Sequence, residues 1–65
     1  MKYKAGDLIY ASSSKIYMFI TDVTEDVPHR YLFYPLKSPE NRSFLFAVDV
    51  DNNANFIKVE SESQI

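Results

Sequence analysis

The sequence predicts an all-β protein, a small five-stranded antiparallel barrel, from three observations. Short apolar segments recur about every ten residues and are separated by polar turns. This spacing is typical of small antiparallel barrels and sandwiches. These segments are rich in β-branched and aromatic residues, which favour strands. Several of them also alternate apolar and polar residues with the period of a strand.

Five extended segments are bounded by turn residues: Asp7 to Ala11, Lys15 to Val23, Arg30 to Leu36, Ser43 to Val50 and Phe56 to Val59. The chain enters the first segment through Gly6, the only glycine, where we expect either a close contact that a side chain would block or a positive φ. The second segment is the clearest strand. It places Ile16, Met18 and Ile20 on one face and Tyr17, Phe19, Thr21 and Val23 on the other.

The third segment, Arg30 to Leu36, is apolar on both faces, so alternation does not decide which face is buried. The fourth segment alternates most regularly, with Phe44, Phe46, Val48 and Val50 on one face. A competing interpretation is a helix that Ser38 caps and that runs to Val48. The fifth segment follows an asparagine-rich hairpin turn.

Length and composition bound the function. We expect one domain over residues 1–60 and a frayed tail over residues 61–65. The chain has no Cys and a single His, which excludes disulfides and cysteine-ligated zinc. The net charge of −2 argues against a protein that binds nucleic acid chiefly by neutralising phosphates. Without a long apolar run or a secretory signal, the expected location is cytoplasmic.

The segment Tyr3-Lys4-Ala5-Gly6-Asp7-Leu8-Ile9-Tyr10 resembles the Lys-x-Gly-Asp opening strand of many Src-homology 3-like barrels in bacterial and phage proteins. The strand count, the polar loop after a long second strand and the short last strand are similar too. The resemblance implies a Src-homology 3-like fold rather than a function. In size and layout the chain is similar to accessory proteins of phages and mobile elements, many of which inhibit or redirect host proteins.

Other constellations have simpler explanations. The segment from Asp49 to Glu60 resembles the calcium loop of an EF-hand, but Ala54 stands where that loop needs glycine and no second loop follows. His29 lies in a polar loop, and no arrangement of a catalytic nucleophile and base accompanies it. The acidic residues are interspersed with basic ones, so they do not form the continuous negative face of a DNA mimic. We therefore expect no enzyme activity, no catalytic residue, no metal and no cofactor.

The aromatic residues carry the functional hypothesis. The five Tyr and five Phe exceed what a small core needs, because other residues already supply one. The expected core consists of Ile16, Met18, Ile20, Leu32, Phe46, Val48, Val50, Ile57 and Val59. We predict that Tyr17, Phe19, Tyr31 and Phe33 share an outer face and, with Arg30, bind another protein, either a different partner or a second copy in a homodimer. The alternative is single-stranded nucleic-acid binding, with bases stacked on Tyr17, Phe19 and Tyr31 and the backbone contacted by Lys15 and Arg30.

Overall fold

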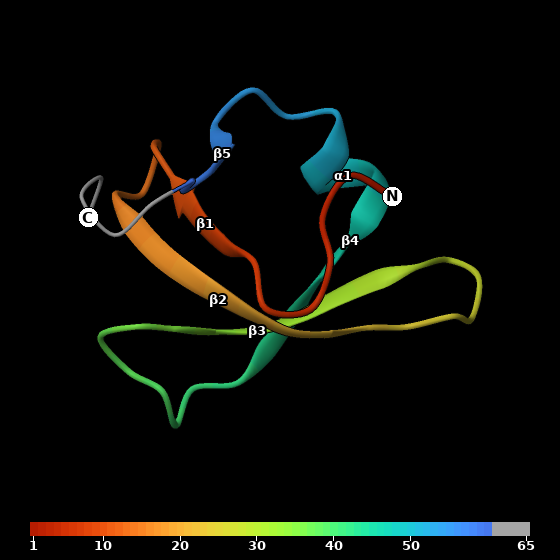
Figure 1. Ribbon diagram of the computed structural model, residues 1–65, viewed down its shortest axis with the longest axis horizontal. Helices are drawn as coiled ribbons and strands as arrows, with labels where there is room; N and C mark the ends of the chain where they lie inside the picture. The colour runs from red at the N-terminus through yellow and green to blue at the C-terminus, as the bar shows by residue number, and fades with distance from the viewer. Residues whose placement is uncertain (61–65) are drawn as a thin grey trace.

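The computed structural model describes residues 1–60, which form one antiparallel sheet and one short helix (Figure 1). In chain order the elements are β1 (Leu8–Ala11), β2 (Ile16–Val23), β3 (Arg30–Pro35), β4 (Ser43–Phe46), α1 (Ala47–Asp51) and β5 (Phe56–Lys58). The strand order is β4-β3-β2-β1-β5, so β4 and β5 are the end strands and the sheet is not closed. The prediction of a five-stranded antiparallel β protein is confirmed, and its barrel closure is not. The predicted tail, residues 61–65, lies outside the described residues.

Four strands begin and end within one residue of the predicted bounds. The turn before β1 contains Gly6 with φ of 95°, as expected of the only glycine. Its N–H donates to the carbonyl oxygen of Ile20 at 2.8 Å, and the N–H of Ile20 donates to the carbonyl oxygen of Asp7 at 3.0 Å. These bonds extend the pairing of the first hairpin to the residues before the start of β1.

The fourth predicted strand is wrong beyond Phe46, because the chain turns there into α1. A helix places residues three apart on one face. Ala47 and Val50 are therefore both buried, while Val48 is exposed. The side-chain amide of Asn52 donates to the carbonyl oxygen of Val48 at 2.9 Å and closes the last turn. A strand through this segment would instead have placed Val48 and Val50 on the same face. The competing helix from Ser38 is also wrong, since β4 occupies that segment.

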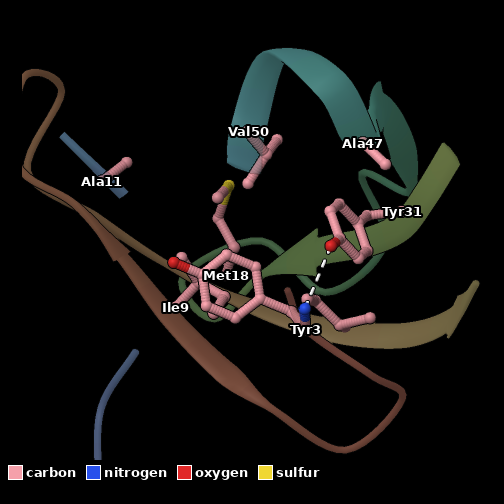
Figure 2. Close-up of a cluster of buried hydrophobic side chains, with 8 residues drawn as sticks. Tyr3, Ile9, Ala11, Met18, Tyr31, Ala47 and Val50 are labelled. Carbon is pink, nitrogen blue, oxygen red and sulfur yellow. Dashed lines mark hydrogen bonds between the residues drawn. The ribbon is translucent and has the colours of Figure 1, made fainter. Parts of the chain in front are cut away.

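The core lies on one side of the sheet, which we call the inner face. Its buried strand residues come from β1, β2 and β3, and the N-terminal segment and α1 cover them (Figure 2). The core consists of Tyr3, Ile9, Ala11, Met18, Ile20, Tyr31, Ala47 and Val50. Val23, Phe33, Leu45 and Phe56 pack around it. The chain thus covers one face of its sheet with its own N-terminus and helix.

A β-bulge in β2 changes which side chains face the core. Ile20 pairs with Phe33 and Asp22 pairs with Leu32, so one extra residue lies between them on β2. The bulge moves Val23 to the inner face, opposite Tyr31. The prediction that Val23 shares the face of Tyr17 is therefore wrong, because strict alternation does not hold across the bulge.

The most connected polar group is the hydroxyl of Tyr31, a residue only 2% exposed. It accepts hydrogen bonds from the backbone N–H groups of Lys2 and Tyr3, both at 3.0 Å, and donates to Asp51 Oδ1 at 2.6 Å. Asp51 Oδ2 also accepts from the Lys2 N–H at 3.2 Å. The bond from Tyr3 is drawn in Figure 2. One hydroxyl thus joins β3, the N-terminal segment and the end of α1.

Replacing Tyr31 with Phe should lower the free energy of unfolding by about 1 to 3 kcal/mol, because the partners of the hydroxyl lose a buried hydrogen bond while the ring stays. Urea denaturation measures this loss. Tyr34→Phe is the matched control, since the Tyr34 hydroxyl bonds to none of the described residues. Equal losses in the two variants would contradict the role of the Tyr31 hydroxyl.

Stability should also fall in alkali. Burial, and then the hydrogen bond to Asp51, raise the pKa of Tyr31 from 10.0 to about 12. Between these two values the unfolded chain releases the proton while the folded chain keeps it, so the stabilisation is complete below pH 10 and is lost as the pH rises towards 12. The shift corresponds to roughly 2 to 3 kcal/mol.

Absorbance of the tyrosinate ion tests this directly. The folded protein should show a late titration step from Tyr31, and this step should be missing in Tyr31→Phe. The stability difference between wild type and Tyr31→Phe should shrink over the same pH range. Identical titration curves for wild type and Tyr31→Phe above pH 10, apart from the amplitude, would refute the raised pKa of Tyr31.

Candidate protein-binding face

The side of the sheet opposite the core, which we call the outer face, carries mostly aromatic and aliphatic side chains. Its side chains alternate with the buried ones along each strand. The cross-strand pairs place Leu8 beside Phe19, Tyr10 beside Tyr17, and Tyr34 beside Phe19. The outer face consists of Leu8, Tyr10, Tyr17, Phe19, Asp22, Arg30, Leu32, Tyr34, Phe44, Phe46 and Ile57.

Aromatic rings on this face pack in neighbouring pairs. The ring centroids of Tyr10 and Tyr17 are 4.7 Å apart, and those of Phe19 and Tyr34 are 5.5 Å apart. Both separations lie in the range of favourable ring contacts. These side chains are half-buried by one another. The centre of the outer face is thus a packed aromatic layer that no other segment among residues 1–60 covers.

The end strand β4 carries the most exposed rings. Phe44 and Phe46 lie in an edge-to-face arrangement with centroids 5.6 Å apart, and they are 47% and 38% exposed. The guanidinium of Arg30 lies 5.6 Å from the centroid of the Phe44 ring, a cation–π contact. At the other end of the sheet, Ile57 is 52% exposed. The guanidinium of Arg30 and the tyrosine hydroxyls are therefore polar groups on this face, and protein interfaces commonly combine such groups with apolar ones.

The structure divides the predicted site residues between the two faces. Tyr17, Phe19 and Arg30 lie on the outer face. Tyr31 and Phe33 lie on the inner face, where Tyr31 is in the core and Phe33 packs against it. Their predicted outward orientation is wrong. Both faces of β3 are apolar, so alternation does not show which face is buried, and the groups that bond to the Tyr31 hydroxyl are distant in sequence. Burial of Tyr31 also removes one of the stacking residues of the nucleic-acid alternative.

Sequence reasoning missed Phe44 and Phe46, because it assigned Phe46 to the core and placed Phe44 on the same face, whereas both are exposed. Their alternation with Leu45 is regular, but alternation shows only that two residues share a face, not which face is buried. The face is settled by pairing, since Phe44 lies opposite Leu32 and Leu45 lies opposite Tyr31. Once Tyr31 is inside, both phenylalanines must be outside.

The EF-hand-like segment does not form one loop. Asp49 and Asp51 lie in α1, and β5 begins at Phe56 and pairs with β1. Asp51 accepts bonds from the Tyr31 hydroxyl and the Lys2 N–H, so its carboxylate is engaged within the fold. Among residues 1–60 no group of three His, Asp or Glu side chains is placed to hold a metal ion.

His29 is held as part of a loop. Its Nδ1 lies 3.0 Å from the carbonyl oxygen of Thr24, which can only accept, so Nδ1 is the donor. The hydroxyl of Thr24 accepts from the Arg30 N–H at 2.9 Å and fixes the same loop. These bonds fix His29 and Arg30 within the loop that precedes β3.

A smaller apolar area lies at the end of the molecule where the loop between β2 and β3 meets α1. A shallow depression there is lined by the exposed side chains of Met1, Val27 and Val48, with His29 among its neighbours. It is separate from the outer face. None of the helices in the described part of the chain is long and apolar enough to span a membrane.

No protein-family model, curated protein sequence or solved structure is similar enough to this chain to indicate a relative.

Phe46→Ser should leave the protein folded, at a cost of about 1 kcal/mol, because the side chain is already 38% exposed and its loss opens no cavity. The sequence alone predicts the opposite, since it assigns Phe46 to the core. Ile9→Ala is the comparison: Ile9 is 1% exposed, and the change should cost about 2 to 5 kcal/mol. Thermal unfolding followed by circular dichroism measures both. Unfolding of Phe46→Ser at room temperature would mean that the outer face is part of the core.

Proposed function

We propose that this protein is a non-enzymatic protein-binding module that contacts its partner with the outer face. One observation carries the proposal: the N-terminal segment and α1 cover the inner face, whereas no helix or strand of the described residues packs over the aromatic layer on the other side. Large uncovered apolar faces are uncommon on small monomeric proteins and mark contact sites.

The composition of the outer face suits protein contact. Tyr and Phe bury much area while few side-chain torsions are fixed, and Arg is enriched at interfaces together with aromatic residues. Phe44, Phe46 and Arg30 combine these properties at one end of the sheet. We expect the residues with the largest binding contribution to be there and around Tyr17.

A Src-homology 3-like barrel is the fold assignment we propose for the sheet. The Lys-x-Gly-Asp opening at residues 4–7, the meander of β1 to β4 and the return of β5 to β1 support it. The similarity in size and layout to phage and mobile-element accessory proteins favours a role as inhibitor or adaptor of a host protein.

Affinity capture from cells that naturally contain the protein tests the function. Two double variants remove opposite ends of the outer face, namely Tyr17→Ser with Ile57→Ser and Phe44→Ser with Phe46→Ser. At least one should abolish capture of a specific partner. Val27→Ser is the matched control, because Val27 is 86% exposed and lies away from the outer face.

The same capture separates protein from nucleic acid. A protein partner held by apolar contacts should survive nuclease treatment and high salt, whereas single-stranded nucleic acid should be released as salt rises. Capture that all outer-face variants retain would contradict the proposed function. Capture that depends on Tyr17 and is lost in high salt would favour the stacking alternative.

A further inference from the structure

The free edge of β4 has backbone hydrogen-bonding groups that bond to no other group among residues 1–60. The Ala47 N–H donates to the carbonyl oxygen of His29 at 2.8 Å, which fixes the phase of the ladder between β4 and β3. In an antiparallel ladder, alternate residues direct their N–H and C=O groups to the same neighbour. The backbone groups of Leu45 therefore point to β3, and those of Phe44 and Phe46 point away from the sheet.

The two end strands differ in how they are protected. β5 has three residues, one of which is Lys58, and a charged side chain on an edge disfavours pairing with another chain. The sequence of β4, Ser43–Phe46, contains no charge, proline or bulge. Of the described elements only β3, along its length, and α1, at its end, contact β4 extensively. This edge lacks the usual protections except that it is short.

We propose that β4 pairs antiparallel with β4 of a second copy of this chain, so that two sheets join edge to edge and their outer faces become continuous. The inference rests on the proposed function and names one partner of the outer face. It assigns the dimer contact to the backbone of Phe44 and Phe46 together with their side chains.

One register satisfies the geometry. A two-fold axis perpendicular to the sheet keeps outer face beside outer face, so a residue must lie opposite one of the same face. Backbone pairing also requires that Phe44 and Phe46 lie opposite residues whose N–H and C=O point outward. Placing Phe44 opposite Phe46 of the second copy meets both conditions and stays within β4. Leu45 then lies opposite Leu45 of the second copy, on the axis.

Side chains are complementary in this register. The phenylalanines of both copies meet on the outer face, where aromatic cross-strand pairs are favourable. Arg42 precedes β4 and is exposed, and Asp49 is exposed in the first turn of α1. The register brings Arg42 of each copy to the start of α1 of the other copy. Opposite charges therefore approach at both ends of the contact.

The size of the contact predicts a weak dimer. A standard interface buries about 800 Å² per partner, roughly one sixth of the 4538 Å² of accessible surface here. Two four-residue edges with their phenylalanines bury less than that. We therefore expect a dissociation constant on the order of 100 μM, in the range of transient contacts.

A synthetic chain tests the edge without changing side chains. Methylation of the Phe44 backbone nitrogen removes the donor that points away from the sheet and leaves the phenyl ring in place. The matched control is the same change at Lys58, whose N–H also points outward, since the neighbouring Val59 N–H donates to the Leu8 carbonyl oxygen at 2.8 Å. Sedimentation equilibrium over about 10 to 500 μM measures the dissociation constant.

We expect wild type to move from 7.6 kDa towards twice that mass as its concentration rises. Methylation at Phe44 should raise the dissociation constant about tenfold or more, and methylation at Lys58 should leave it nearly unchanged. A wild-type chain that stays monomeric throughout overturns the proposal, as does equal weakening by both methylations.

Failure here is distinguishable from failure of the proposed function. A dimer that resists methylation at Phe44 but dissociates in Tyr17→Ser with Ile57→Ser is stacked face to face, which overturns edge pairing and retains the outer face as the contact. A monomeric chain whose capture of another protein depends on the outer face leaves only the edge pairing refuted.

Disulfide formation tests the register. The chain has no Cys, so Leu45→Cys introduces one thiol on the proposed axis, where cross-strand Cβ atoms are about 4.5 to 5.5 Å apart. Ser43→Cys is the control, because that position lies about 13 Å from its own copy in this register. Mild oxidation should link Leu45→Cys into a dimer and leave Ser43→Cys mostly unlinked, after circular dichroism has shown that both are folded. Equal linking of the two variants overturns the register.

Discussion

The fold depends on one buried hydroxyl, that of Tyr31. A phenol group removed from water is costly unless its hydrogen-bonding capacity is used, and here two backbone N–H groups and the Asp51 carboxylate use it. The same bonds hold the N-terminal segment and the end of α1 over the sheet. Tyr3, Ala47 and Val50 also attach these segments by packing in the core, and the Tyr31 hydroxyl adds hydrogen bonds to both segments at once. Tyr31 is therefore both a core residue and the link between the elements that cover the core.

The orientation of Tyr31 decides the rest of the sheet. With Tyr31 facing inward, its neighbours Leu32 and Arg30 face outward, and the pairing with β4 then puts Phe44 and Phe46 outward as well. The bulge in β2 keeps Ile20 and Val23 both on the inner face despite the odd spacing between them. A single polar interaction on the inner side thus sets the composition of the outer side, two strands away.

Local signals explain which parts of the fold are predictable. Turn residues and alternation place four strands to within one residue, because these signals act between neighbours in the chain. The face of β3 is not predictable in this way: both of its faces are apolar, and the partners that favour Tyr31 inside lie 28, 29 and 20 residues away. Helix α1 is not predictable from the sequence for a related reason. The segment Ala47–Asp51 alternates like a strand, and only the buried positions available above the core select the spacing of Ala47 and Val50.

The exposure of the outer face is a consequence of the small size of the chain. About 60 residues are too few to cover both faces of a five-stranded sheet, and here the N-terminus and α1 are both used on the inner face. The aromatic residues of the outer face partly bury one another in the middle of the sheet, where each strand has two neighbours. The end strands have one neighbour each, so exposure rises there, to 47% at Phe44 and 52% at Ile57.

Apolar exposure and unpaired backbone groups therefore coincide at the edges of the sheet, and only at β5 does a charged strand residue oppose pairing. A contact that begins at β4 covers both kinds of unsatisfied surface at once, whereas one that begins at the centre covers rings that already have partners.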